Sequence, residues 1–257
     1  MIKDLPFTPG EFQNRLAHVR QEMERLEIDG LLVMAPEDMY YLTGYRSMGF
    51  FAFQALVVTQ KGEPIMISRK LEELIFNNNS WTNSFRAYYD HEDPVLTTVG
   101  LLEELGLAGK RLGVPMNSNY LPAAIMKRLE SALPNIKWTD TTQLVARLRW
   151  VKSPAEIEYI RQAGTLTRIG ITAGVEVAQE GGSENDIAAA FLHTIIRNGS
   201  ERPGGGPLIG SGPRSAFGHS SWENRTLIRG DLIFLEGGGA SGDTTLERCD
   251  PFHWSPI

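Results

Sequence analysis

The sequence has one cysteine, Cys249, and no long apolar run. A single thiol cannot form an internal disulfide, which favours a reducing compartment. No apolar segment approaches the roughly 18 residues that cross a bilayer, and residues 1–10 lack the apolar core of a secretory signal. We therefore expect a cytoplasmic protein with no membrane partner.

Positive charge is also scarce, because 25 Lys and Arg stand against 31 Asp and Glu, giving a net charge of -6. A sequence-independent grip on nucleic acid needs clustered cations that neutralise phosphates, so nucleic acid is not expected as a partner. A small molecule or a peptide fits this charge better. With 257 residues, of which 42% are hydrophobic, the chain is long enough for one large core or two moderate ones.

Three helix starts share one local pattern, a hydroxylated residue followed three positions later by an acid. This is the capping box or a near relative, in which side chains bond the free N–H groups of the first turn. The pairs are Thr8 with Glu11, Ser153 with Glu156, and Ser183 with Asp186. Apolar residues at helical spacing follow each start. We expect the first helix to end near Glu27 and the third to stop at Gly199.

Between the first two helices the pattern is typical of strands, at residues 30–35, 54–59 and 64–68. Helical stretches at 95–105 and 121–133 enclose a strand-like segment at 111–114. This alternation predicts an α/β domain with a mixed sheet and flanking helices. We place it at residues 1–145, with a second domain at 146–257.

Two glycine runs, 204–206 and 237–239, mark places where the backbone bends sharply or approaches a neighbour closely. The alternative is a flexible loop. The apolar run 232–235 predicts a buried strand that ends at Glu236, just before the second run.

Several segments resemble one superfamily in one order, the creatinase and aminopeptidase P superfamily of pita-bread hydrolases. They are residues 15–16 and 30–33, then 41–45, 56–58, 62–64 and 68–69, and lastly the segment LRWVKSPAEI at 148–157. The resemblance runs from Phe7 to Arg248. It implies a complete creatinase-type N-terminal domain followed by an incomplete α+β pita-bread domain whose C-terminal portion is missing. Two prolines follow Arg248 where a strand should continue. A truncation, a premature stop or a shifted reading frame would each explain this end.

His219, Arg225, Gly230 and Asp231 occur at the spacing H-x5-R-x4-G-D. This spacing resembles the family's active-site histidine and the turn that enters its first metal-bearing strand. An imidazole suits acid-base work because its pKa lies near working pH. The alternative is a surface histidine in a Gly/Ser/Pro-rich loop. We interpret the other four histidines as structural or solvated.

The metal question depends on the acids at the second strand. In the metallopeptidase branch an aspartate ligand stands where this sequence has Glu236. Counting straight, Glu247 matches the second aspartate. Aligning the family's later arginine with Arg248 instead places the neutral Thr245 there, as in creatinase, which works without metal. The family's remaining ligands lie downstream of this sequence. A divalent ion (Mn, Co or Zn) is therefore expected only if those ligands exist.

The resemblance implies a hydrolase that cleaves a C–N bond in a dipeptide or in a small amide or guanidino metabolite. His219 is the expected acid or base, and Glu236 orients it, binds a substrate cation or holds a metal. Arg225 and Arg214 are candidates for a substrate carboxylate, although loop arginines are more often solvated. We expect the chain by itself to be inactive. The alternatives are a non-catalytic binding protein on the same scaffold and a metal-dependent lyase.

The family commonly dimerises, so the resemblance also implies a homodimer. Met48, Phe50 and Phe51 form an apolar cluster that either contributes to such an interface or faces the core.

Overall fold

We describe the fold from a computed structural model in which residue 3 and residues 5–202, 206–242 and 244–253 are described, the last range by its backbone alone. The chain divides into two compact units, Met1–Val151 and Lys152–Ile257. The boundary expected near residue 145 lies inside a short helix, α6 (Leu144–Leu148), which packs against α1 in the first unit.

The first unit is built on a six-stranded sheet in the order β4-β3-β2-β1-β5-β6. Strand β2 alone runs antiparallel to its neighbours, and the other pairs are parallel. The strands are β1 (Gly30–Val33), β2 (Ala55–Thr59), β3 (Ile65–Arg69), β4 (Phe85–Tyr88), β5 (Arg111–Val114) and β6 (Lys137–Asp140). The expected mixed α/β sheet is confirmed.

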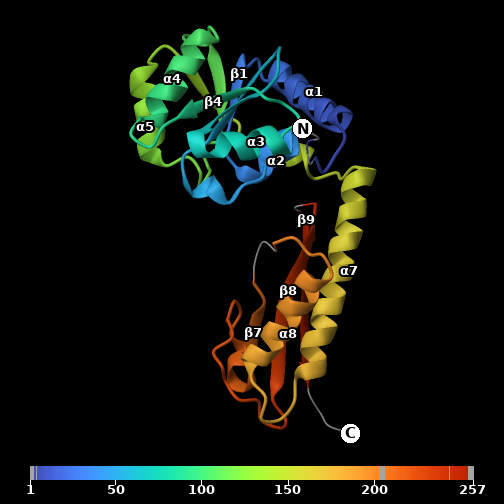
Figure 1. Ribbon diagram of the computed structural model, residues 1–257. Helices are drawn as coiled ribbons and strands as arrows, with labels where there is room; N and C mark the ends of the chain where they lie inside the picture. Colours follow the sequence, from blue (N-terminus) through green and yellow to red (C-terminus); the bar gives the residue numbers. More distant parts are fainter. Residues whose placement is uncertain (1–2, 4, 203–205, 243, 254–257) are drawn as a thin grey trace. The chain divides into compact units, whose positions relative to one another are not determined.

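Helices cover both faces of this sheet (Figure 1). They are α1 (Pro9–Arg25), α2 (Pro36–Thr43), α3 (Glu73–Asn79), α4 (Pro94–Glu104), α5 (Ala123–Ala132) and α6, with short 3-10 turns η1 (Met48–Phe51) and η2 (Lys70–Glu72). Strand β1 shows why its sequence is continuously apolar. Leu31 and Val33 enter one hydrophobic cluster with α1 and α6, whereas Leu32 enters a second cluster with α4 and α5. A strand that is buried on both faces carries apolar residues in a continuous run, without polar alternation.

The second unit pairs two helices with a three-stranded antiparallel sheet in the order β7-β8-β9. Its elements are α7 (Pro154–Val177), α8 (Glu184–Arg197), β7 (Leu208–Ser211), η3 (Gly212–Ala216), β8 (Leu232–Ser241) and β9 (Thr244–His253). Both helices begin at complete capping boxes, with Ser153 and Glu156 at α7 and Ser183 and Asp186 at α8. These two helix starts, predicted from sequence, are confirmed.

Close approach between helix and sheet explains the second glycine run. A Cβ on Gly237 would lie 2.5 Å from the Phe191 ring, and one on Gly239 would lie 2.5 Å from Leu166. This close approach was one of the two expectations for the run and is confirmed, whereas Gly237–Gly239 lie inside β8, which runs on to Ser241, so the prediction that the strand ends at Glu236 was wrong. Of the first run, Gly204 and Gly205 lie outside the described residues.

Strand β9 pairs with β8 along its whole length, with Ser241 opposite Thr244 and Leu232 opposite His253. It continues through Pro251, which pairs with Phe234, so the expectation of a break at this proline was wrong. Proline is tolerated on a strand at the edge of a sheet, where one N–H can be lost without loss to the ladder, and β9 is at the end of the order in the described sheet. Among the described helices, none has the combined length and hydropathy needed to span a bilayer.

Candidate functional site

Glu236 lies in the middle of β8, paired with Leu208 of β7 on one side and Cys249 of β9 on the other. Its neighbours Leu235 and Gly237 face the helices, since a Cβ on Gly174 of α7 would meet Leu235 and one on Gly237 would meet Phe191. Side chains alternate along a strand, so Glu236 projects from the opposite face of the sheet, away from α7 and α8. It is half-buried there.

His219 lies on the loop between η3 and β8 and is exposed. Its backbone has φ 60°, in the left-handed region that few non-glycine residues adopt. Within the part of the chain that the structure describes, no hydrogen bond or ion pair joins His219 to Glu236. The structure therefore does not bring the two expected catalytic groups into direct contact.

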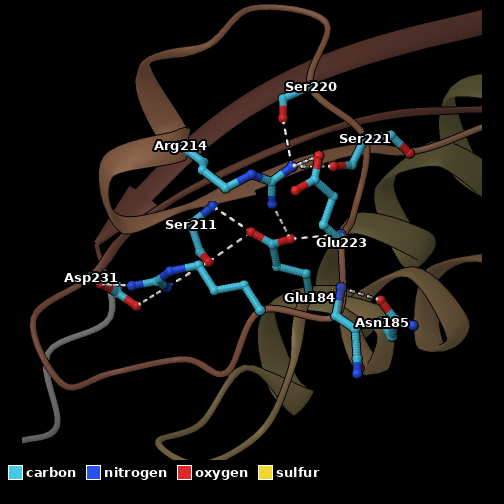
Figure 2. Close-up of polar contacts among 10 residues, drawn as sticks. Glu184, Asn185, Ser211, Arg214, Ser220, Ser221, Glu223 and Asp231 are labelled. Atoms are coloured by element: carbon cyan, nitrogen blue, oxygen red, sulfur yellow. Dashed lines mark hydrogen bonds and ion pairs between the residues drawn. The ribbon is translucent and has the colours of Figure 1, made fainter.

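The loop is anchored on a fully buried carboxylate, Glu184, at the first turn of α8 (Figure 2). Its Oε1 accepts from the backbone N–H of Ser211, at 2.9 Å, and from the Ser211 hydroxyl, at 2.8 Å. Its Oε2 accepts from the Glu223 N–H, at 2.9 Å, and from the guanidinium of Arg214. The carboxylate thus connects the end of β7, η3 and the loop that carries His219.

Arg214 extends this connection to the residues directly after His219. Its Nη2 donates to the Ser220 Oγ, at 2.9 Å, and to the Ser221 carbonyl, at 2.6 Å, and it lies 3.2 Å from Glu223 Oε1. Figure 2 shows the guanidinium between Glu184 and these loop residues. Arg214 is therefore occupied by the protein's own acceptors.

Arg225 forms a second ion pair, a two-pronged one with Asp231 at the entrance to β8. The same guanidinium donates to the Ser211 Oγ at 2.7 Å, so the two pairs are linked through one hydroxyl. A Cβ on Gly212, whose φ is 55°, would lie 2.5 Å from Nη2 of Arg225 and 2.6 Å from Oδ1 of Asp231. Glycine is required at 212 because the ion pair fills the space of a side chain.

Both acids of this network are held ionised. Burial by itself would raise the pKa of Glu184, but the hydrogen bonds from Glu223, Ser211 and Arg214 outweigh it and hold the pKa below its ordinary value. The hydrogen bonds from Arg225 likewise lower the pKa of Asp231, and Asp231 raises the pKa of Arg225. Charged hydrogen bonds of this kind are among the strongest in proteins.

The structure places the sequence-predicted residues unequally. Arg214 and Arg225, expected as contacts for a substrate carboxylate or as solvated side chains, are brought together through Ser211 and Glu184 and are paired with acids. Glu247 pairs through its backbone with Gly238, two positions from Glu236 along β8, and its side chain lies outside the described residues.

Sequence reasoning missed Glu184, which lies between Ser183 and Asp186, the two residues of the predicted capping box. A signal was present, because Glu184 precedes Ile187, Phe191 and Ile195 at helical spacing and so extends the buried stripe of α8 by one turn. An acid on a buried stripe needs a cationic partner. Arg214, thirty residues later, supplies it.

A pair of divalent ions needs several carboxylates or histidines within reach of each other. Among the described residues, no group of three His, Cys, Asp or Glu side chains is arranged to hold a metal ion. Within the described part of the chain, Glu236 by itself does not fit such a site.

Comparison with known proteins adds the family. Residues 15–151 match the creatinase/prolidase N-terminal domain, and residues 158–245 match metallopeptidase family M24. An uncharacterized hydrolase/peptidase of Sinorhizobium fredii, y4tM, is 35% identical over 238 residues, which cover 88% of this chain and 60% of the relative. The ectoine hydrolase of Halomonas elongata is 27% identical over 253 residues, which cover 91% of this chain and 63% of the relative.

The crystal structure of the prolidase from Pyrococcus horikoshii has the same fold, with a TM-score of 0.78 over 93% of this chain and 64% of that chain, at 22% identity. The chain therefore spans less than two thirds of the length of these relatives. The expected resemblance is confirmed on both halves of the sequence. The chain belongs to the creatinase and M24 peptidase superfamily, a family of hydrolases, and comprises its creatinase/prolidase N-terminal domain followed by part of its peptidase domain.

Proposed function

We propose that the full-length enzyme containing these residues hydrolyses a C–N bond in a small amide or guanidino metabolite. The observation that carries the proposal is the position of Glu236. It is a half-buried carboxylate at the centre of β8, on the sheet face that α7 and α8 leave uncovered. A carboxylate at such a place has no apolar packing role, and it offers an acceptor to a cationic or N–H-bearing substrate.

The chemistry needs a proton donor for the leaving nitrogen. Water adds to the carbon of the scissile bond, the C–N bond breaks, and the nitrogen takes a proton from the imidazolium of His219. The neutral imidazole is then recharged by the proton that the attacking water gives up. Glu236 holds the N–H groups of the substrate while the charge on the nitrogen changes.

Two similarities favour a small metabolite over an Xaa-Pro dipeptide. The ectoine hydrolase of Halomonas elongata aligns along 91% of the chain. The string Thr244-Thr245-Leu246-Glu247-Arg248 resembles creatinase at the point where the metallopeptidases carry their second aspartate. The name of the Halomonas elongata relative denotes a small-molecule substrate, ectoine, and the resemblance to creatinase favours the same class of substrate.

The test uses the full-length enzyme on three substrates, namely creatine, ectoine and an Xaa-Pro dipeptide. We expect turnover of a metabolite, measured as urea or as ring-opened product, and a loss of about 100-fold or more in His219→Ala. His193→Ala is the matched control, because His193 is exposed on α8 and should leave turnover unchanged. Proline release with bound metal would instead assign a peptidase, and silence on all three substrates would favour a binding protein.

We also propose that the protein is a homodimer that uses the apolar cluster of η1. Met48, Phe50 and Phe51 do not face the core, and Phe51 is 80% exposed. Burial of such rings between subunits would remove apolar surface from water. We expect Phe51→Asp to shift the protein toward monomer in sedimentation velocity, whereas Leu96→Asp, at an exposed leucine of α4, should not. An unchanged sedimentation coefficient in Phe51→Asp would remove this cluster from the interface.

A further inference from the structure

We infer that Glu184 and Arg214 are a positioning pair that fixes the loop of residues 217–223 and so holds the imidazole of His219 in place. The inference rests on the proposed function only for the role of His219. The ordering of the loop by the pair is a separate physical claim and is tested separately.

Arg214 bonds the loop on both sides of His219, through its backbone carbonyl before the histidine and through its guanidinium after it. The backbone carbonyl of Arg214 accepts from the Phe217 N–H at 3.0 Å, two residues before the histidine. Its guanidinium holds the Ser220 hydroxyl directly after it. Ser220 N–H in turn donates to the Phe217 carbonyl at 3.3 Å. His219 is therefore the middle of a short turn whose two ends are bonded to one arginine.

The hydrogen bonds that hold the loop are strong because the carboxylate and the guanidinium that form them are buried or nearly so. Glu184 has no exposed surface, and the side chain of Arg214 is 17% exposed. The carboxylate is fixed to the end of β7 by the N–H and the hydroxyl of Ser211. Charged hydrogen bonds sheltered from water are stronger than exposed ones, so the loop inherits the rigidity of the sheet.

The conformation of His219 shows why such an anchor is needed. A residue with a Cβ at φ 60° is held there only when the surrounding structure determines it. His219 itself is exposed, so packing does not supply that restraint. The hydrogen bonds of Arg214 to Ser220 and Ser221 supply it. The pair thereby sets the direction in which the imidazole projects.

The first experiment measures amide hydrogen exchange of Ser220 and Glu223 in the chain. We expect Arg214→Gln to accelerate both amides by about tenfold or more, since a hydrogen bond to a charged group contributes at least that factor to closing the loop. Amides of β8 should stay protected. Arg168→Gln, at an exposed arginine of α7, is the matched control and should leave both rates unchanged.

Ser220→Ala covers the case in which Arg214→Gln unfolds the whole unit. It removes one of the two hydrogen bonds from the Arg214 guanidinium to the loop, the one to the Ser220 hydroxyl, and leaves Glu184 paired with Arg214. Faster exchange of the backbone amides at positions 220 and 223 in this variant supports the inference. Protection equal to that of the wild type, in whichever of the two variants remains folded, overturns it.

The second experiment measures the pH profile of kcat and KM in the full-length enzyme. We expect Arg214→Gln to lower kcat about tenfold or more and to move the limb that belongs to His219, with partial recovery in Arg214→Lys. An ordered loop with an unchanged profile would overturn the positioning role. A disordered loop with a normal profile would instead leave the loop claim standing and remove His219 from the proposed chemistry.

Discussion

At the scale of the residue, the ionised carboxylate of Glu184 organises the donors around it in the second unit. It is fully buried and accepts from a guanidinium, two N–H groups and a hydroxyl. Removing the charge would leave these donors without the partner around which they are arranged. Removing one partner of a buried ion pair destabilises a protein more than replacing both partners by apolar residues does.

We predict that Glu184→Gln lowers the free energy of unfolding of the second unit by about 3–5 kcal/mol at neutral pH. The free energy of unfolding of the variant should also fall less steeply than that of the wild type as the pH is lowered. Because hydrogen bonds hold the folded pKa of Glu184 below its ordinary value, its contribution is complete above the ordinary pKa of about 4.3 and is lost as pH falls through the lowered value. Urea titrations from about pH 7 to about pH 3 measure both effects.

The control for this prediction is Glu176→Gln, at an exposed position of α7. It removes the same charge and should change the free energy of unfolding by less than about 0.5 kcal/mol. Equal stabilities of Glu184→Gln and the wild type at all pH values would contradict the importance given to the buried carboxylate.

The same scale shows what local sequence can and cannot predict. The helix starts at Ser153 and Ser183 were predicted because a capping box lies within four consecutive residues. The pairing of Glu184 with Arg214 was not, since Arg214 is far along the chain and only the fold joins them. The interaction of Arg225 with Asp231 was also missed, although both residues were singled out for their spacing.

At the scale of the element, the well-buried strands of the first unit were predicted and the more exposed ones were not. Strand β5 was predicted with the bounds that the structure gives, Arg111–Val114. Strands β4 and β6 were missed because their four residues are mostly half-buried or exposed and carry little apolar signal. Helix α2 was missed too, although Pro36 and the acids Glu37 and Asp38 in its first turn and Gly44 at its C-terminus, at φ 81°, mark it locally.

The interior of β8 was the largest error, and its cause is tertiary. Three glycines in succession predict either a sharp bend or a close approach to a neighbour, and here the second holds, because Gly237 and Gly239 lie under Phe191 and Leu166. Phe191 belongs to α8 and Leu166 to α7, and nothing in the local sequence shows that these helices pack on the strand. A glycine that makes room for a neighbour cannot be told from a glycine that makes a turn without that neighbour.

We predict that Gly237→Ala lowers the free energy of unfolding by about 1–3 kcal/mol, because the new methyl group would overlap the Phe191 ring. Gly218→Ala is the control, since a Cβ there meets nothing within 4 Å. Chemical denaturation of both variants measures the difference. Recovery of stability in a Gly237→Ala, Phe191→Leu double variant would identify the overlap as the cause, whereas equal stability of Gly237→Ala and wild type would contradict it.

At the scale of the whole molecule, the apolar cores follow the division of the chain. Two hydrophobic clusters lie on the two faces of the first sheet, and a third lies between α7, α8 and the second sheet. Each of the two units therefore has a core that its own elements close.

We expect two transitions in calorimetry, one for each unit. Residues 1–151 produced alone should reproduce one of them, with its midpoint unchanged within about 3 °C. The far-ultraviolet circular dichroism of this piece checks that the mixed sheet is formed. A single transition in the whole chain, absent from the piece, would show that the units fold only together.

The bare backbone under Phe191 and Leu166 has one more consequence, which concerns slippage. If β8 slid by one residue against the helices, one direction would place the side chain of Glu236 in the space that Gly237 leaves open, and the other would place Ala240 in the space that Gly239 leaves open. A hairpin shifted by one residue in either direction would therefore clash with the helices, which favours the observed register of β8. Gly237 and Gly239, which have no side chains, thus set the register in which β8 packs against the helices.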